Sequence, residues 1–412
     1  MTACTPLSTK PTTQAIGTVA IERAQVLVEG RLEMTSVRFD SDREVIGELD
    51  AAERPASVID GRDLVALPGI VDIHGDAFER QLMPRPRVHF PVDLALIESD
   101  RQAVTNGITT VFHGVTWSWE PGLRDGNNAR ALLAAIERLR MSLAADTHYH
   151  LRHETYNIAA EAEIATWLAA RRIGALAFND HMTSIVEASS SRGRKLATMV
   201  ERSGVSQEDF LAVVDRTKAR ANEVPNSICR LAAAAVAAGV PLLSHDDTGP
   251  EQRRAFRALG CRVAEFPTTL AAAQEAADGG DDVVFGAPNV VRGGSHTGWL
   301  DASEMISRGL CSVLASDYYY PAPLAAATSL VARGVVALPQ AWALISEQAA
   351  AAVSLDDRGR IEPGKRADLV LVDLQRDHPR IVATVVAGRI VYLAEAWRLS
   401  RSAAPRPLSA PR

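Results

Sequence analysis

The feature that most limits the possible folds of this chain is a series of short apolar runs, rich in β-branched residues, that each end in polar side chains. Ala-rich windows with helical spacing separate several of them, for example residues 128–145 and 162–172. Strands and helices that alternate in this way are typical of βα units around a parallel sheet. Eight such runs occur in order: GIVDIHGD, ITTVFHGV, THYHLRHE, IGALAFNDH, VPLLSHDD, CRVAEFP, DVVFGAPN and CSVLASDYYY. We therefore predict an α/β fold whose main domain is a (β/α)8 barrel.

The polar residues at the ends of these runs are candidates for a metal site, because an α/β barrel carries its active site at the carboxyl ends of its strands. In the first run, alternation along the strand puts His74 and Asp76 on the same face. A mixed set of imidazoles and carboxylates suits zinc or manganese better than magnesium or calcium. The candidate ligands are His74, Asp76, Glu154, His245, Glu265 and Asp317.

Three further residues near the run ends are either ligands or partners that orient the ligands: Asp180, His181 and Asp246. We expect one member of the pair Asp180 and His181 to contact the metal directly. Asp246 and Asp247 are adjacent and face opposite ways on a strand, which favours the orienting role for them. For Glu265 the alternative is an ion pair with an arginine at the barrel mouth.

Both chain ends have a different pattern, in which short stretches of alternating polar and apolar residues are separated by turn residues. Residues 18–67 predict a small antiparallel sheet, and residues 359–393 add two or three strands with a turn at Ala387-Gly388. We expect one small β-sandwich domain, built from residues 15–66 and 355–396, beside a barrel of residues 67–354. Residues 1–14 and the Pro- and Ser-rich residues 397–412 are expected to be disordered.

The composition argues against several classes of function. The net charge of -6 and the pI near 6.0 argue against a nucleic-acid partner. Residues 1–14 lack the charged start and apolar block of a signal peptide, and Gly239 and Pro241 break the longest Ala-rich run, so we expect no membrane span. The four cysteines form no C-x-x-C pair, which predicts neither a disulfide framework nor a cysteine zinc site. A reducing cytoplasm fits this cysteine usage best.

The residues at the strand ends resemble the amidohydrolase superfamily, whose barrels carry a metal site that runs from an H-x-H motif on the first strand to an aspartate on the eighth. The segment DIHGD departs from that motif, with Asp76 in place of the second histidine. Glu154 resembles the bridging glutamate of the deacetylase branch, and Glu265 stands where that branch has a histidine. The resemblance implies one or two divalent ions, zinc or manganese, and Asp317 as the base that takes a proton from the attacking water, whose pKa the metal lowers.

A narrower resemblance covers residues 67–321 and rests on six segments taken together: HGDAFERQLMPRP, HLRHE, SHDD, AEFPTT, GAPNVVRGGSHTG and ASDYYYP. They look like the family of α-D-ribose 1-methylphosphonate 5-triphosphate diphosphatases (PhnM) of the carbon–phosphorus lyase pathway. The resemblance implies a small phosphorylated substrate that is cleaved to the 5-phosphate and pyrophosphate, with phosphonate-pathway enzymes as candidate partners. A second copy of the chain, in a homo-oligomer, is a separate candidate partner. The segment from His113 to Gly126 departs from that family and leaves a shifted substrate open.

A triphosphate needs cationic and amide donors. Arginines follow the first metal motif, and the segment VRGGSHTG offers a further arginine, glycines for close approach of backbone amides, and polar side chains. The candidate substrate-binding residues are Arg80, Arg85, Arg292, Ser295, His296 and Tyr318. The alternative is a solvated loop with ordinary surface arginines, and packing of Tyr318, Tyr319 and Tyr320 over the barrel rim.

Two other functions stay open. A metal-dependent deacetylase or related amidohydrolase would use the same activated water on the carbonyl carbon of an N-acyl or cyclic amide substrate, but the arginine-rich loops count against it. A non-catalytic barrel would serve as a binding module. Such a chain should have lost ligands, whereas the expected strand ends here still carry polar candidates.

Overall fold

The computed structural model describes residues 18–49, 55–85, 88–182, 194–295, 298, 300–376 and 378–401. Residues 1–14, which we expected to be disordered, lie outside the described residues, and so do residues 402–412 of the expected tail. Within the described ranges, no helix combines the length and the apolar character that a membrane span requires.

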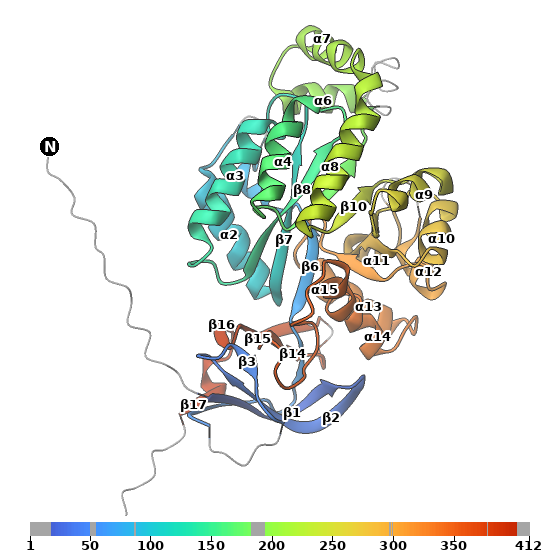
Figure 1. The fold of residues 1–412 in the computed structure, drawn as a ribbon. Helices are drawn as coiled ribbons and strands as arrows, with labels where there is room; N and C mark the ends of the chain where they lie inside the picture. Colours follow the sequence, from blue (N-terminus) through green and yellow to red (C-terminus); the bar gives the residue numbers. More distant parts are fainter. Residues whose placement is uncertain are drawn as a thin grey trace, which may run out of the picture.

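The central element is a barrel of eight parallel strands, which confirms the predicted fold class (Figure 1). The strands are β6 (Ile70–Gly75), β7 (Ile108–Trp117), β8 (Asp146–Glu154), β9 (Ala175–Asn179), β10 (Leu242–His245), β11 (Val263–Glu265), β12 (Asp282–Gly286) and β13 (Val313–Ala315). They follow one another in sequence order, and each overlaps one of the eight apolar runs. A bridge between Gly75 and Asp317 joins the first strand to the residues after the last one and nearly closes the barrel.

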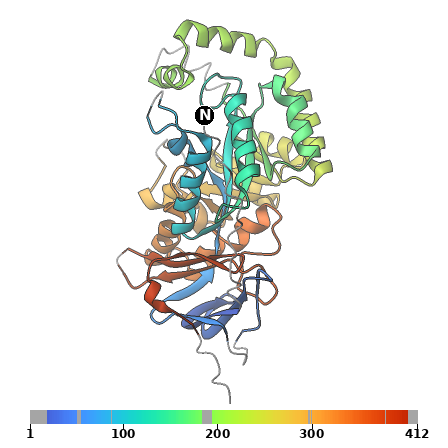
Figure 2. The ribbon, with the colours of Figure 1, turned by 90° about the vertical axis from the view of Figure 1, so that its left-hand side faces the viewer.

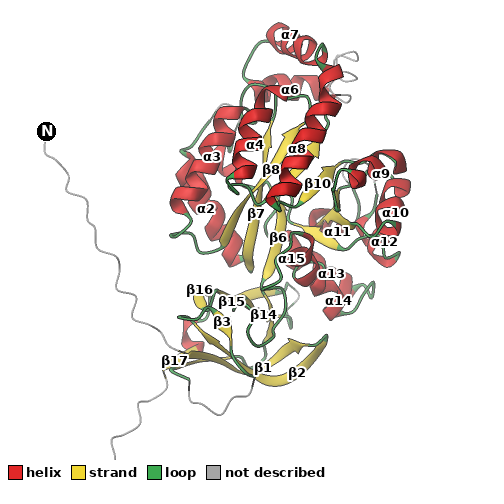
Figure 3. Ribbon diagram, in the orientation of Figure 1, coloured by secondary structure: helices red, strands yellow, loops and turns green. Residues whose placement is uncertain are grey.

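Helices follow the strands and cover the outside of the barrel (Figure 3). The described helices are α1 (Phe78–Leu82), α2 (Val92–Thr105), α3 (Gly126–Leu139), α4 (Glu161–Ala169), α6 (Arg194–Ser203), α7 (Gln207–Lys218), α8 (Val224–Ala238), α9 (Pro250–Ala258), α10 (Leu270–Asp278), α11 (Ala287–Arg292), α12 (Ala302–Ser307), α13 (Ala322–Ala332), α14 (Leu338–Ala343) and α15 (Glu347–Ala352). Helices α2 and α3 contact β7, α8 contacts β10, and α10 contacts β11 and β12. Helices α6 and α7 lie at the end of the molecule opposite the small sheet (Figure 2).

Side-chain alternation along the strands separates the barrel interior from the layer under the helices. On β9, Ala175 and Ala177 belong to the interior cluster, whereas Leu176 and Phe178 pack outward under the helices. The interior cluster includes Val71, Ile73, Phe112, Ala175, Ala177, Leu243, Val263, Val284, Val313 and Ala315. The barrel is therefore a packed core, and its polar inward side chains gather beyond this layer, toward the carboxyl ends of the strands.

Both chain ends build one nine-stranded sheet, which confirms the small β domain. Its strands are β1 (Thr18–Val28), β2 (Arg31–Asp40), β3 (Val45–Ile46), β4 (Ser57–Asp60), β5 (Val65–Pro68), β14 (Leu369–Asp373), β15 (Arg380–Val386), β16 (Arg389–Leu393) and β17 (Leu399–Arg401). The expectation of a purely antiparallel sheet is wrong. Strand β3 lies at one edge of the sheet, next to β2. The chain then crosses over, so that β4 and β5 both pair with β1 and run parallel to it. Strand β17 pairs with β4 inside the segment we expected to be disordered from residue 397.

The apolar segment from Leu67 to Ile73 is divided between the two sheets at Gly69. Leu67 belongs to β5 in the small sheet, and Ile73 belongs to β6 of the barrel. A Cβ at Gly69 would lie 2.2 Å from Oγ1 of Thr109, so only glycine lets the chain pass β7 this closely while it changes sheets. The amide of Gly69 donates to the carbonyl of Asp368 at 2.9 Å, which ties the passage to the C-terminal segment.

The carboxylate of Asp146 joins the barrel to the C-terminal segment through ion pairs. Oδ2 of Asp146, at the start of β8, lies 2.6 Å from Nη1 of Arg358, 2.7 Å from Nη1 of Arg366 and 3.1 Å from Nε2 of His148. Although burial alone would raise it, His148 and the two arginines hold the pKa of Asp146 well below its usual value. We expect Asp146→Asn to lower the free energy of unfolding at pH 7 by about 3 kcal/mol, because it leaves two guanidiniums with an uncharged partner.

This effect should depend on pH in one direction. A carboxylate whose pKa is lowered in the folded state contributes stability above its unfolded pKa of about 3.9, and that stability is lost as the pH falls. In denaturant titrations, the difference between wild type and Asp146→Asn should therefore shrink by about 1 kcal/mol between pH 7 and pH 3. Glu304→Gln, from an exposed pair with Arg308, is the control and should cost less than about 0.5 kcal/mol. An equal loss at both pH values would rule out the ion-pair explanation.

Candidate metal centre

The first group of polar side chains forms where the barrel closes. His74 lies near the end of β6, Asp76 follows that strand, and Asp317 follows β13. The amide of Asp317 donates to the carbonyl of His74 at 2.9 Å, and the amide of Asp76 donates to the carbonyl of Asp317 at 2.8 Å. One ligand atom of each side chain lies within 4.8 Å of those of the other two. Backbone pairing between the first and last strands therefore sets the spacing of these three groups.

Asp72 and Gly75 of β6 hold the chain in place at this closure. Asp72 is fully buried, and its carboxylate accepts hydrogen bonds from the amide and the hydroxyl of Ser316 at 2.9 and 2.6 Å. A Cβ at residue 75 would lie 2.6 Å from Oδ2 of Asp72. Glycine at position 75 therefore lets Asp72 hold Ser316, the residue before Asp317.

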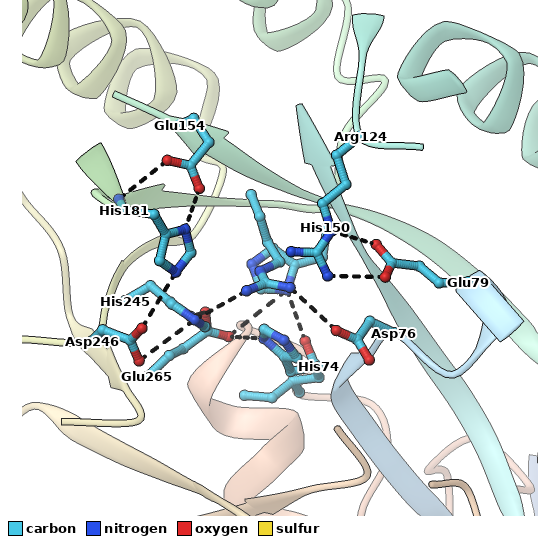
Figure 4. Close-up of polar contacts among 12 residues, drawn as sticks. His74, Asp76, Glu79, Arg124, His150, Glu154, His181, His245, Asp246 and Glu265 are labelled. Carbon is cyan, nitrogen blue, oxygen red and sulfur yellow. Dashed lines mark hydrogen bonds and ion pairs between the residues drawn. The ribbon is translucent and has the colours of Figure 1, made fainter. Parts of the chain in front are cut away.

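Glu265, at the end of β11, is fully buried between imidazoles (Figure 4). Its Oε1 lies 2.9 Å from Nδ1 of His74, and its Oε2 lies 3.2 Å from Nδ1 of His245. A carboxylate that accepts the Nδ1–H of an imidazole fixes the tautomer of the ring and leaves the lone pair of Nε2 for a metal. We expected Glu265 to be a direct ligand, and that assignment stays a prediction. Its contacts with the two rings are those of a carboxylate that orients ligands, and one of its oxygens also lies within 4.8 Å of ligand atoms of His74 and His150.

Sequence reasoning missed a third imidazole, that of His150 on β8. Its Nδ1 lies 3.0 Å from the carbonyl oxygen of Ile73, and its buried Nε2 has no hydrogen-bond partner among the described residues. Its ring lies 5.3 Å from the ring of His74. The signal was present in the sequence, because His150, Arg152 and Glu154 alternate along β8 and so share its inner face.

A second group joins Glu154, His181 and Asp246 (Figure 4). Oε1 of Glu154 lies 2.5 Å from Nδ1 of His181, and Nε2 of His181 lies 3.5 Å from Oδ2 of Asp246. Glu154 raises the pKa of His181 to about 9. Although burial alone would raise it, His181 holds the pKa of Glu154 at about 2. His181, His245 and Asp246 also offer ligand atoms that lie within 4.8 Å of one another.

Burial is the largest influence on the pKa values of His74, His245, Glu265 and Asp317. It lowers the pKa of His74 to about 3, and it raises the pKa of Glu265 and of Asp317 to about 7. Burial first, and then the charge of Arg152, lower the pKa of His245 well below its usual value. His74 and His245 are thus neutral near pH 7, which is the form in which histidine binds a metal.

Two arginines that the sequence analysis did not select lie in or beside the centre. Arg152, on β8 and 5% exposed, has Nη1 3.3 Å from Oδ2 of Asp76 and donates from Nη2 to Nε2 of His245 at 3.1 Å. Arg124 donates from Nε and Nη2 to the two oxygens of Glu79, both at 2.9 Å. Each guanidinium is paired with a carboxylate, and neither arginine belongs to the set that we expected to bind phosphate.

Three residues that follow barrel strands have left-handed backbones: Asp246 (φ 60°), Phe266 (φ 53°) and Asp317 (φ 54°). Residues other than glycine rarely adopt this conformation, and such positions cluster at active sites. The backbone thus turns sharply next to His245, next to Glu265 and at Asp317 itself.

The structure separates the adjacent polar residues of the fourth and fifth runs. Of the pair Asp180 and His181, His181 joins the second group, while Asp180 is exposed. Of Asp246 and Asp247, Asp246 joins the group, while the buried Asp247 lies 3.1 Å from the guanidinium of Arg253. One member of the second pair thus faces the centre, and the other faces Arg253.

A cavity of about 140 Å³ adjoins the centre. Its lining includes Asp246 and Asp317 from the centre, together with Ser295 and Tyr318 from the expected substrate-binding set. Arg80 is exposed, donates to the carbonyl of Tyr318, and has its guanidinium 5.6 Å from the Tyr318 ring. A larger cavity of about 670 Å³, between α13 and β15, is lined by none of the clustered side chains.

Two other expected substrate-binding residues, Arg85 and Arg292, do not line the cavity beside the centre. Arg85 and Arg292 are exposed, and His296 lies outside the described residues. Of the neighbouring tyrosines, Tyr319 is 47% exposed and Tyr320 is 2% exposed, so both differ from Tyr318 in their surroundings. Among the described members of this set, Ser295 and Tyr318 reach the cavity.

The donor set fits a divalent metal. The Nδ1 atoms of His74, His150, His181 and His245 each lie close to an oxygen, so a metal would bind these rings at Nε2. On His245 that atom accepts from Arg152, and on His181 it lies 3.5 Å from Oδ2 of Asp246. Nε2 of His150 gives the most direct support for a bound metal, because it is buried and has no hydrogen-bond partner among the described residues. Imidazoles mixed with carboxylates match the preferences of zinc and manganese.

A barrel with histidines and carboxylates at its strand ends defines a class of hydrolases, and the comparison with protein families agrees. The family model described as "Amidohydrolase family" matches residues 98–392. The chain belongs to the amidohydrolase family. Among curated proteins, the α-D-ribose 1-methylphosphonate 5-triphosphate diphosphatase of Escherichia coli (strain K12) is 31% identical over 393 residues, which cover 92% of this chain and 100% of the relative. This match confirms the resemblance to the PhnM diphosphatases that the six sequence segments predicted.

Solved structures share the fold at lower identity. A molinate hydrolase matches with a TM-score of 0.61 at 15% identity and covers 91% of this chain and 94% of its own. A β-aspartyl dipeptidase from Fervidobacterium islandicum-AW-1 matches with a TM-score of 0.58 at 14% identity and covers 92% of this chain and 97% of its own. At these identities the likeness concerns the fold alone, because one barrel hosts many reactions.

Proposed function

We propose that this chain is a metal-dependent diphosphatase that cleaves α-D-ribose 1-methylphosphonate 5-triphosphate to the 5-phosphate and pyrophosphate in phosphonate catabolism. The observation that carries the proposal is the 31% identity to the E. coli diphosphatase over the whole length of that relative. The arginines at the barrel mouth, Arg152 and Arg124, support it, because phosphate oxygens match the guanidinium fork and an N-acyl substrate has no need of it.

We propose zinc or manganese, as one or two ions, in this centre. The ligands would come from the grouped side chains of His74, Asp76, His150, His181, His245, Asp246 and Asp317, together with Glu154 from the sequence pattern. Glu265 is grouped with His74 and His150, and we assign it the role of orienting His74 and His245. When bound, a divalent metal supplies an activated water and offsets phosphate charge.

In this proposal Asp317 takes the proton of the attacking water as that water attacks the phosphorus nearest the ribose. Asp317 belongs to the first group of the centre and also lines the adjoining cavity, so it lies between the candidate ligands and the space where we place the substrate. The charged groups in the cavity lining are the acids Asp246 and Asp317. The cavity therefore suits the ribose hydroxyls, with Ser295 and Tyr318 as neighbours, while the arginines hold the phosphates.

The cellular setting follows from the same proposal. We propose a cytoplasmic enzyme that works beside other phosphonate-pathway enzymes, without nucleic-acid or membrane partners, and that forms a homo-oligomer. Light scattering of the purified protein tests the last point, since a mass of 44.2 kDa would mean a monomer.

The test of the reaction is the release of pyrophosphate by purified protein loaded with zinc or manganese. The ribose 1-methylphosphonate 5-triphosphate should yield pyrophosphate, and the corresponding 5-diphosphate, which lacks one phosphate, should yield none. Removal of the metal with a chelator should abolish release, and its return should restore it. Hydrolysis of an N-acyl substrate without any release from the triphosphate would replace the proposal with the deacetylase alternative.

The side chain of Asn179, at the end of β9, offers a more local test. It is fully buried, pairs in register with Glu154, and lies two residues after the interior Ala177, on the same face. Neither its amide nitrogen nor its oxygen has a hydrogen-bond partner among the described residues. A buried amide without a partner costs folding free energy, so we expect it to serve the bound substrate or metal ligands.

We therefore expect Asn179→Leu, which has a similar volume, to lower kcat/KM by at least about tenfold while the free energy of unfolding stays equal or rises. Pyrophosphate release and denaturant unfolding measure the two quantities. A variant that loses stability and keeps its activity would assign Asn179 to the fold instead.

A further inference from the structure

Arg152 occupies the space between two candidate metal ligands. Nη1 lies 3.3 Å from Oδ2 of Asp76, and Nη2 lies 3.1 Å from Nε2 of His245. The side chain is almost fully buried, and its Nε has no acceptor among the described residues. The Arg152 guanidinium therefore contacts Oδ2 of Asp76 and Nε2 of His245, which are the atoms that would bind a metal.

The hydrogen bond to His245 fixes which nitrogen of that ring carries the proton. Arginine only donates, so Nε2 of His245 must accept, and Nδ1–H then faces Oε2 of Glu265 at 3.2 Å. A neutral imidazole has one lone pair, here on Nε2. His245 therefore cannot accept from Arg152 and bind a metal at the same time.

We propose that a divalent metal displaces Arg152 from His245 and Asp76, and that the freed guanidinium then binds an anionic phosphate oxygen of the substrate. This inference rests on the proposed function for the identity of the anion. A buried guanidinium that loses its acceptors needs another one, because unpaired buried donors are costly. The planar fork of arginine matches two oxygens of one phosphoryl group.

A consequence is coupling between the metal and the anion. Without phosphate, metal binding has to break the contacts of Arg152, which lowers the metal affinity of the wild-type protein. With phosphate present, the released donors gain a partner, and the affinity rises. Since such coupling is reciprocal, the metal should strengthen phosphate binding by the same factor.

The experiment is a calorimetric titration of the metal-free protein with Mn²⁺, with and without inorganic phosphate. Arg152→Met keeps the length of the stem and removes the donors. Without phosphate it should bind Mn²⁺ at least about tenfold more tightly than wild type, since one charge-assisted hydrogen bond no longer opposes the metal. Phosphate should tighten Mn²⁺ binding in wild type several-fold more than in this variant. Arg130→Met, on α3, where the guanidinium pairs with Glu163, is the matched control and should behave as wild type in both titrations.

The outcomes separate the inference from the proposed function. Equal or weaker Mn²⁺ binding by Arg152→Met overturns the displacement, and an equal phosphate effect in both proteins overturns the phosphate role. If both differences hold while the ribose triphosphate releases no pyrophosphate, the inference stands and the proposed substrate fails. Thermal melting checks the fold of each variant. If Arg152→Met does not fold, Arg152→Lys replaces it, because the single ammonium of lysine cannot contact both Asp76 and His245. Its Mn²⁺ affinity should again exceed that of wild type.

Discussion

Asp317→Asn will reduce the rate of pyrophosphate release by about a hundred- to ten-thousandfold while bound metal stays nearly unchanged. Asparagine cannot take a proton from the attacking water, and general-base catalysis is worth about a hundred- to ten-thousandfold. The amide keeps the shape and one ligand oxygen of the carboxylate. Asparagine also tolerates the left-handed backbone that residue 317 adopts at φ 54°. Steady-state kinetics together with metal analysis of the same samples measure the two quantities.

The control for this variant is Asp278→Asn, in an exposed aspartate at the end of α10. It should match wild type in rate, metal content and melting temperature. Full activity in Asp317→Asn would remove Asp317 from the mechanism, whereas loss of most of the metal would make it chiefly a ligand.

Glu265→Gln will weaken metal binding by about 10- to 100-fold, the usual effect of losing a group that orients metal-binding histidines. The two oxygens of Glu265 face Nδ1 of His74 and Nδ1 of His245, at 2.9 and 3.2 Å. Glutamine offers one oxygen and one NH₂ group. Its oxygen can accept the Nδ1–H of one ring, but its NH₂ group then faces the Nδ1–H of the other ring, and two donors repel each other. Titration of the metal-free protein with Zn²⁺ measures the affinity, with Glu251→Gln as the exposed control on α9.

Two other results would change the role of Glu265. Wild-type affinity in Glu265→Gln would show that its contacts with the imidazoles do not matter for the metal. Complete loss of the metal with an intact fold would make Glu265 a direct ligand, as the sequence pattern first predicted.

The barrel could be predicted because its strands carry local signals. Buried parallel strands need continuous apolar runs, and the helices between them need Ala-rich amphipathic windows. The small sheet could be predicted as well, because its C-terminal strands show alternation and a turn at Ala387-Gly388. Both residues of that turn have positive φ. The break at Gly69 could not be predicted, because the need for glycine there comes from Thr109, forty residues away in sequence.

The centre was predictable where a polar residue stands at a strand end, as at His74, His245 and Asp317. His150 was missed because it lies inside β8, four residues before the end of that strand. Arg152 was missed for another reason. Its position between Asp76 and His245 depends on three strands meeting at the barrel mouth, which no local pattern encodes.

The most direct test of the account is phosphorus NMR of ribose 1-methylphosphonate 5-triphosphate turned over by the zinc-loaded protein in water enriched in ¹⁸O. The account predicts pyrophosphate and the 5-phosphate in equal amounts, with the isotope shift on the 5-phosphate, because the water attacks the phosphorus nearest the ribose. An unchanged spectrum from protein with measured zinc content would contradict the proposed reaction. An isotope shift on pyrophosphate would contradict the proposed site of attack.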